Sequence, residues 1–492
     1  MSLSIGLDAA NSGLAAGAQQ TSVASRNIAR VSQPGATRKI VNLATVSGGG
    51  VRVASITRAS DEGLLKVSLN AQAGQSKQSA IAKSLATLAT SLGDPQNNIS
   101  PAALVDSLDA ALQAYAGSSY DSATAGAAVT AARSMAKGLN LAANLVSTVR
   151  QKADSDIASS VDTVNSLLAT FETVNTGIVQ GTQTKRDTTD LEDQRDQILQ
   201  KLSDEIGIRT FTRGNNDTVI QTDSGVTMFE TKPRVVSFEA SPFLSAGNDT
   251  NPVYVDGVPV TSQATGMPVS TGRIAGLVKV ADDIAPKYGK QLDEMARGLI
   301  TAFAETDQSA TPSLPAIPGL FTYSGSPAMP AAGPAIAGLA SSIKISPSVD
   351  PDQGGSINRL RDGGIGAPGN PAYVYNLTGA SGYSDRIRGL MSSLESTQSF
   401  DPATGLKTQG TLSSFAADSA SWLAGAHKTA ASDADYQSIV LDRANTSLSN
   451  ATGVNLDQEV TSMLDIERSY QASAKILGVI NQMLDQLMTS VR

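Results

Sequence analysis

The feature that most constrains the fold of this chain is a heptad pattern near its C-terminus. From Leu456 onward, seam residues recur with alternating gaps of four and three, which places them along one side of a long helix. The seam consists of Leu456, Val460, Met463, Glu467, Tyr470, Ala474, Leu477, Asn481, Leu484, Met488 and Val491. At 1.5 Å per residue the helix would be roughly 50 Å long. Such a helix needs a partner along its apolar face.

Polar residues define where this helix begins and leave its register open. Asn455 is suited to cap the first turn, with Gln458 three residues later as its capping-box partner. Glu467 and Asn481 occupy seam positions where apolar residues are expected. Either they specify the register of a coiled coil at a cost in stability, or Ile466 and Ile480 replace them in the seam. We favour the second alternative.

The N-terminus carries a second seam with the same spacing. It consists of Leu3, Leu7, Ala10, Leu14, Gly17, Thr21, Ala24, Ile28 and Val31. The small residues in its middle allow close approach of another helix but bury little area per contact. Each seam alone would also suit an ordinary helix of a helical domain. Together they predict that the two ends of the chain pair as a coiled coil.

Between the ends, the periodicity changes from helix to strand and back. Two alternating segments, 37–47 and 50–59, predict a hairpin across the glycines 48–50. Residues 61–205 are nearly continuous in helical period, short alternating strands follow Ile208, and helical periods return at about 282–307 and from about 384. The predicted fold class is mainly α with a small antiparallel β domain inserted into a helical body.

The expected domains follow from these changes in period. The terminal coiled coil comprises 1–35 and 453–492, and the helical body comprises 36–207, 273–308 and 383–452. The inserted β domain covers 208–272, and 309–382 is an irregular Pro/Gly-rich outer or loop region. In the last helix before the strands, Leu191, Ile198, Leu202 and Ile206 are expected to be buried. Its acidic residues Asp190, Glu192, Asp193 and Asp196 are expected to face solvent beside Arg195 and Lys201.

Composition excludes several function classes. Cysteine is absent and His427 is the one histidine, so a thiol nucleophile or a Cys/His zinc site cannot be built. We interpret His427 as a structural or surface residue. The net charge of −8 gives no basic surface for nucleic acid, and no run of 18 apolar residues predicts a membrane span. The N-terminus lacks the features of a cleaved secretory signal. We therefore predict no catalytic residues, cofactor or metal.

Four regions of the chain resemble the axial proteins of the bacterial flagellum, most closely the hook-associated protein 1 family. The segment "NIARVSQPG" from Asn27 is similar to an N-terminal signature of these proteins, although Arg30, Gln33 and Ala36 depart from it. "GVNLDQE", "RSYQASAKIL" and "MLDQLM" resemble the family's closing segment, and "DLEDQRDQILQKLS" resembles a segment that precedes its β hairpins. "AARSMAKGLNLAANLVSTVRQ" resembles its long bundle helix. Residues 309–382 match nothing in this comparison.

The resemblance implies a structural subunit that self-assembles as a ring or helix at the junction between hook and filament. It also implies export without a cleaved signal, an extracellular place in the flagellum, contact with hook protein and with a filament-side junction protein, and a cytoplasmic export chaperone at the C-terminal helix. The expected subunit and chaperone interface is Leu3, Leu7, Leu14, Ile28, Val31, Leu456, Val460, Met463, Tyr470, Leu477, Leu484 and Met488.

Three alternatives are kept. The nearest one is a hook or distal rod protein of the same axial family, since those proteins share the "SYQA" and Asn-Ile-Ala patterns. A secreted helical effector or adhesin would have this composition but not the paired terminal signatures. The remote one is a secreted enzyme, such as a glycoside hydrolase that uses two of Asp350, Asp352 and Asp362. Acids in Pro/Gly-rich loops more often form turns than catalytic pairs.

Overall fold

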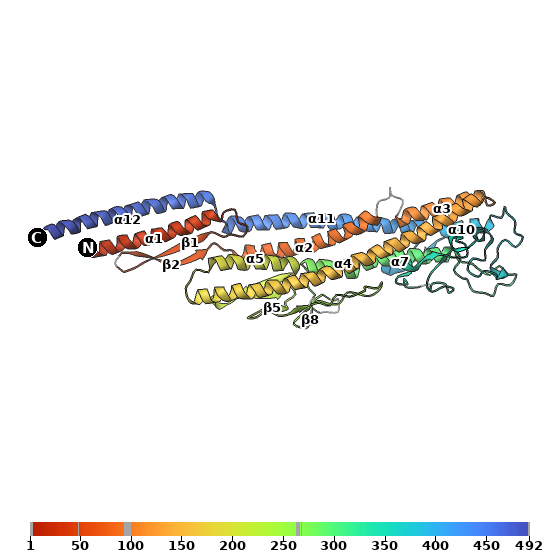
Figure 1. Cartoon of the computed structure of the whole chain (residues 1–492), viewed down its shortest axis with the longest axis horizontal. Coiled ribbons are helices and arrows are strands. Elements are labelled where there is room, and N and C mark those ends of the chain that lie inside the picture. The colour runs from red at the N-terminus through yellow and green to blue at the C-terminus, as the bar shows by residue number, and fades with distance from the viewer. Residues whose placement is uncertain are drawn as a thin grey trace.

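The chain forms an elongated molecule whose long helices run along one axis. The computed structural model describes residues 3–47, 49–92, 100–261, 266, 268–331 and 333–490. Both termini lie at one end of this axis, and the irregular segments after residue 308 gather at the other (Figure 1). Val491, the last residue of the predicted C-terminal seam, lies outside the described residues.

The end that carries both termini is a terminal arm of two helices and a hairpin. It contains α1 (Leu3–Ala29), β1 (Lys39–Thr45), β2 (Val51–Arg58) and α12 (Leu456–Ser490). The two strands pair antiparallel from Lys39–Arg58 to Thr45–Val51, with an irregularity after Asn42, so the predicted hairpin is confirmed. α1 packs against α12 on one side and against the hairpin on the other.

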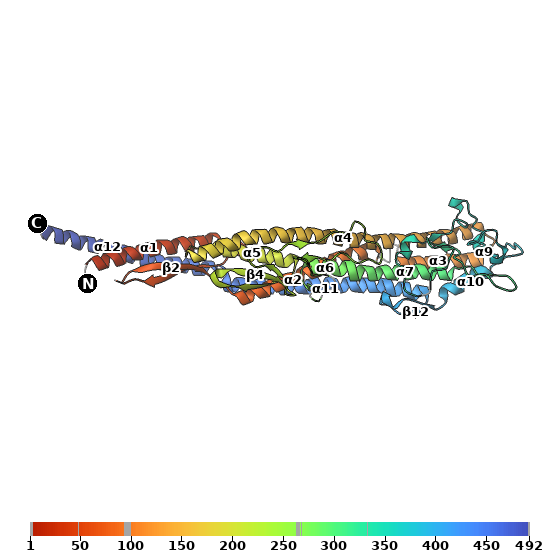
Figure 2. The same ribbon diagram turned by 90° about the horizontal axis from the view of Figure 1, so that it is seen from below.

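The body is a bundle organised around one very long helix. α2 (Glu62–Leu92), α3 (Pro101–Gly117), α4 (Ser122–Gln183), α5 (Thr189–Glu205) and α11 (Leu412–Thr452) lie roughly along the molecular axis (Figure 2). α4 has 62 residues, and Asp121 caps its N-terminus by accepting the N–H of Ala123. Buried residues recur along its whole length, so α4 carries the core from the arm side to the distal end.

A second helical stretch begins earlier than the sequence indicates. α6 (Arg273–Lys279) leads through a π-helical turn at Val280–Ile284 into α7 (Ala285–Ala302). The π turn precedes Pro286, which has no N–H to donate within a regular helix. The helix therefore covers 273–302, rather than about 282–307.

The alternating segments after Ile208 form two three-stranded antiparallel sheets. The first is β3 (Ile208–Thr212), β4 (Thr218–Thr222) and β5 (Thr227–Phe229), with a short 3-10 turn, η2 (Gly214–Asn216), between the first two strands. The second is β6 (Val236–Ser237), β7 (Tyr254–Val255) and β8 (Val258–Pro259). Phe229 meets Phe171 of α4 edge to face, with ring centroids 4.9 Å apart. The sheets thus share a core with α4 and α5.

The Pro/Gly-rich region closes the distal end of the bundle with short elements. These are β9 (Phe321–Thr322), α8 (Leu339–Ser342), β10 (Lys344–Ile345), η4 (Pro351–Gln353), α9 (Arg359–Asp362) and η5 (Pro371–Tyr373). They are followed by α10 (Asp385–Glu395), β11 (Gln398–Ser399), η6 (Pro402–Thr404) and β12 (Gln409–Gly410). Phe321, Leu339 and Leu360 are buried and belong to the same core as α3, α4 and α7.

Candidate assembly interface

The two terminal helices pair antiparallel along their small residues. Gly6 lies opposite Ile480 and Gly17 opposite Tyr470, so the N-terminus of one helix meets the C-terminus of the other. A Cβ added at Gly6 would lie 3.2 Å from the Ile480 Cδ1 atom, and one added at Gly13 would lie 3.0 Å from the Ser473 Oγ atom. The small residues of α1 are therefore what lets α12 approach closely, and the predicted pairing of the ends is present in a single chain.

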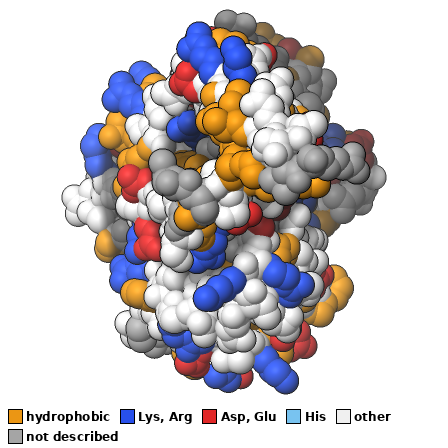
Figure 3. Space-filling model, turned by 90° about the vertical axis from the view of Figure 1, so that its left-hand side faces the viewer, with side chains coloured by type: hydrophobic (Ala, Val, Ile, Leu, Met, Phe, Trp, Pro, Cys, Tyr) orange, Lys and Arg blue, Asp and Glu red, His pale blue; other side chains and the backbone are white. Residues whose placement is uncertain are grey.

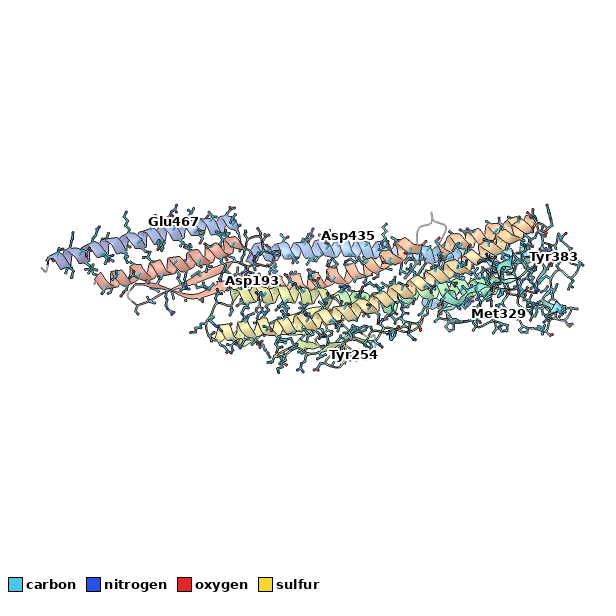
Figure 4. The ribbon with its side chains drawn as sticks, in the orientation of Figure 1. Asp193, Tyr254, Met329, Tyr383, Asp435 and Glu467 are labelled. Carbon is cyan, nitrogen blue, oxygen red and sulfur yellow. The ribbon has the colours of Figure 1, made fainter. Side chains whose placement is uncertain are left out.

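The polar residues of the C-terminal seam do not face α1. Ile466 and Ile480 are 9% and 8% exposed, whereas Glu467 and Asn481 are exposed. Figure 4 labels Glu467 on α12. The helix is turned so that the neighbouring isoleucines fill the seam, because their burial removes apolar surface from water while the polar side chains stay hydrated. The alternative that we favoured is the one observed.

The predicted interface residues divide into two groups. Half-buried within the arm are Leu3, Leu7, Leu14, Ile28, Met463 and Leu477. Exposed are Val31 (41%), Leu456 (47%), Val460 (46%), Tyr470 (46%), Leu484 (38%) and Met488 (75%). Val31 lies beyond the end of α1 at Ala29. The second group keeps exposed apolar surface that is accessible to other chains, although Tyr470 also packs against Gly17 within the arm.

Two exposed apolar surfaces remain on the arm. The first, here called the outer groove, is a groove of about 680 Å³ lined by Ala18, Thr21, Val460, Met463, Leu464, Glu467 and Tyr470. The second, here called the C-terminal stripe, consists of Ile476, Val479, Met483 and Leu487, which are about half exposed. The stripe was not predicted from the sequence, because its residues lie outside the single heptad seam of this helix. The view from the arm end shows apolar side chains gathered among charged ones (Figure 3).

Asn27 joins the two helices and the hairpin at the base of the arm. Its side chain is buried, and it both accepts from the Lys39 N–H and donates to the Lys39 carbonyl, each at 2.9 Å. The same Nδ2 donates to the Glu459 carboxylate at 3.1 Å, and that carboxylate also pairs with Arg38 at 2.7 Å. Asn27 thereby bonds to a strand backbone and to α12 at once. This is the physical role of the first residue in the "NIARVSQPG" segment.

A buried ionic cluster, here called the junction cluster, connects the arm to the body. It contains Lys39 and Arg58 from the hairpin and Asp193 and Asp196 from α5. Lys39 pairs with Asp193, and the Arg58 guanidinium lies 3.2 Å from Asp193 and 2.6 Å from Asp196. The Thr37 hydroxyl donates to Asp193 at 2.6 Å. Figure 4 labels Asp193 at the place where arm and body meet.

The junction cluster corrects the prediction for the acidic residues of α5. Asp193 has a fully buried side chain, and Arg195 is also buried, where it donates to the Asn216 carbonyl at 2.6 Å. Glu192 pairs with Arg58, and only Asp190 is about half exposed. The prediction was wrong because the partners come from residues 37–58, far away in the sequence. Of the expected buried residues, Ile198, Leu202 and Ile206 are buried and Leu191 is partly buried.

Burial and charge act against each other within the junction cluster. Burial lowers the pKa of Lys39, against the attraction of Asp193. Burial also acts to lower the pKa of Arg58, but the attraction of Asp196, Glu192 and Asp193 outweighs it and raises that pKa. Burial raises the pKa of Asp196 in spite of Arg58. Each charge is thus tolerated inside only because its partners stay in place.

The loss of Asn27 should loosen the arm without unfolding the body. In Asn27→Ala, two bonds to Lys39 and one to a carboxylate disappear and leave buried groups unpaired, at a cost of about 2–4 kcal/mol. We expect faster amide hydrogen exchange at the start of α12 and in β1, with little change in α4. Asn42→Ala is the matched control, because Asn42 is only partly buried and its side chain bonds to hairpin hydroxyls. Equal exchange in the two variants would contradict this role.

The carboxylates considered for a glycosidase are occupied by structural contacts. Asp350 is buried, pairs with Arg133 and caps η4. Burial opposes its ionisation, but bonds from Gln353 and Arg133 outweigh that effect and lower its pKa, unlike the raised pKa of a general acid. Asp352 also pairs with Arg133, and Asp362 pairs with Arg361 and accepts from Asn376. These contacts argue against the enzymatic alternative.

Among the described residues, no group of three or more His, Asp or Glu side chains is arranged to hold a metal ion. His427 lies half-buried on α11. None of the described helices combines the length and hydropathy needed to cross a membrane.

Comparisons with known proteins place two segments of the chain in flagellar families. Residues 85–311 match the family model of the flagellar hook-associated protein FlgK helical domain. Residues 448–490 match that of the flagellar basal body rod FlgEFG protein C-terminal region. The chain is similar to flagellar hook-associated protein 1 of Bacillus subtilis (strain 168), with 23% identity over 382 residues, which cover 73% of this chain and 70% of the relative.

A solved structure also matches part of the chain. It is the flagellar hook junction protein FlgK from Burkholderia pseudomallei, with 21% identity and a TM-score of 0.42. The match covers 52% of this chain and 46% of that one, so it spans less than half of the solved protein's length.

Proposed function

We propose that this chain, which belongs to the FlgK family of flagellar hook-associated proteins, joins hook and filament by packing its terminal arm against the arms of neighbouring copies. Members of this family are structural components of the flagellum. The C-terminal match to rod and hook proteins agrees with a shared mode of assembly through the last helix.

The observation that carries this proposal is the unfilled surface of α12. Of its 35 residues, only Glu459, Ile466 and Ile480 are buried, although apolar side chains continue to Met488. Apolar surface of this extent marks an interaction site. The junction cluster fixes the arm to the body, so the body can hold the arm in place for contact with other copies.

The export steps belong to the same proposal. An apolar helix that is covered by neighbours in the assembly must be covered by something else before assembly. We propose a cytoplasmic chaperone that binds α12, followed by export without signal cleavage. The exposed residues from Leu456 to Met488 support this, since they are accessible in the single chain.

A strain that lacks this chain tests the junction role. We expect hooks to form, filaments to be absent, and flagellin to appear in the medium. The intact gene should restore filaments and end the loss of flagellin to the medium. Electron microscopy and an immunoblot of the medium give the readout. Missing hooks would point to the hook or rod alternative, and normal filaments would contradict a role in the junction.

The arm should be the most protease-sensitive part of the isolated subunit. Its helices bury few residues in the single chain, so local opening of the arm costs less free energy than opening of the body. Limited proteolysis should remove the first thirty or so residues and the last thirty or so, and leave a body from about residue 50 to 450. Mass spectrometry identifies the cuts. Cleavage within α4 at the same rate would contradict the expectation.

A further inference from the structure

The two exposed apolar surfaces of the arm differ in their position along α12 and in the side of the helix on which they lie. The outer groove lies along the first half of α12, around Leu464, and the C-terminal stripe lies along the second half, around Val479 and Met483. At 3.6 residues per turn, the stripe lies on nearly the opposite side of α12 from the groove. One arm therefore cannot use both surfaces toward a single neighbour.

We infer that the C-terminal stripe of one copy fills the outer groove of a second copy, with the two α12 helices parallel. This inference rests on the proposed function and adds which surfaces meet. Two different patches in contact make a heterologous interface, which repeats from copy to copy instead of closing as a two-fold dimer. Each internal copy then has one neighbour in its groove and another over its stripe.

The positions of the two surfaces set the displacement between neighbours. The centre of the groove residues on α12 and the centre of the stripe are separated by sixteen to seventeen residues, about 25 Å along a helix. The neighbour must therefore be shifted along the axis by about this length for its stripe to reach the groove. Such contacts build a staggered helical assembly, not a flat ring of copies at one level.

A pair of free charges supports the same displacement. Asp457 and Lys475 are exposed, and neither has an ion pair among the described residues. They are separated by eighteen residues, about 27 Å on a helix, which is close to the displacement of the apolar surfaces. Asp457 lies on one flank of the groove and Lys475 on the corresponding flank of the stripe. With parallel helices and this shift, Lys475 of the neighbour comes beside Asp457. If two neighbouring copies were not displaced along the axis, Lys475 of one would lie too far from Asp457 of the other to pair with it.

The absence of cysteine from the chain allows a direct test. A strain producing only the Leu464→Cys/Val479→Cys variant is grown, its flagella are isolated and oxidised, and the subunit is followed on a non-reducing immunoblot. We expect a ladder of covalent dimers, trimers and larger species. Leu464→Cys/Asn481→Cys is the matched control, because Asn481 is exposed but lies on nearly the opposite side of α12 from the stripe, and it should stay monomeric.

Other results would overturn the inference and leave the proposed function intact. Dimers from Leu464→Cys alone would show two-fold pairing of grooves. Filaments without cross-links in the Leu464→Cys/Val479→Cys variant would show that the stripe lies elsewhere. Failure of the deletion strain to lose filaments would instead contradict the junction role itself.

Charge exchange provides a second measurement that does not depend on cysteine. Asp457→Lys and Lys475→Asp should each place like charges together and reduce the fraction of cells with filaments. The variant that carries both substitutions should restore that fraction, because opposite charges meet again. If the double variant is no better than the single ones, the two residues do not meet between copies.

Discussion

Asp193→Ala should destabilise the attachment of the arm to the body by about 3–5 kcal/mol, because it leaves buried cations without their partner. The Lys39 side chain is 1% exposed and that of Arg58 is 8% exposed, so water cannot replace the lost carboxylate. Thermal unfolding of the purified subunit should begin at a lower temperature, and hydrogen exchange should rise in β1, β2 and α5. Cells with this variant should produce fewer filaments, because the arm is no longer held in a fixed orientation relative to the body.

Asp190→Ala is the matched control for this prediction. Asp190 lies three residues earlier on the same helix and pairs with Arg30, but its side chain is 47% exposed. An exposed pair contributes at most about 1 kcal/mol. A loss of stability no greater in Asp193→Ala than in Asp190→Ala would contradict the role of the junction cluster.

A double variant that removes both charges shows whether the instability of Asp193→Ala comes from the unpaired buried cations or from the missing ion pair itself. Lys39→Met with Asp193→Leu removes both charges of the pair, and Arg58 keeps Asp196 and Glu192 as partners. Replacing a buried ion pair by apolar residues of similar volume is often nearly neutral. We expect this double variant to recover most of the stability lost in Asp193→Ala, as measured by thermal unfolding.

The helices and the hairpin could be predicted because their evidence is local. The period of buried residues in α4, the Asn455 side chain that accepts the Gln458 N–H at 3.2 Å, and the alternation on either side of the hairpin glycines all lie within single segments. The pairing of the two ends could also be predicted, because both ends carry seams of the same spacing and the small residues of the N-terminal seam allow another helix to approach closely.

The junction cluster could not be predicted from the sequence because its partners are distant. Nothing near Asp193 in the chain indicates that Lys39 and Arg58 will cover it, and charged helix faces are usually hydrated. The distal end has the same difficulty. Asp293 of α7 accepts from the backbone of Gly338 and Ala340, at 3.0 and 2.8 Å, and these contacts hold a segment without periodicity. Burial raises the pKa of Asp293 to about 6.

Ile466→Asp with Ile480→Asp should separate α1 from α12 and abolish filaments. Burial of an isoleucine contributes about 1.5–3 kcal/mol, and a buried aspartate adds a desolvation cost, so the pair should destabilise the arm by more than about 5 kcal/mol. Amide hydrogen exchange should become faster in α1 and α12, because the two helices no longer protect each other. Thermal unfolding of the body should change little, since neither residue belongs to its two cores.

The control for this last prediction places acids one position further along the same helix. Glu467→Asp with Asn481→Asp introduces the same side chains on the outer side of α12, where both native residues are exposed. This variant should keep a helical arm and should keep filaments, because the seam with α1 is intact. Hooks should be present in both strains, so electron micrographs distinguish the two outcomes. If cells with the Ile466/Ile480 variant swim normally, a paired terminal arm is not required for the junction, and the function proposed for it is wrong.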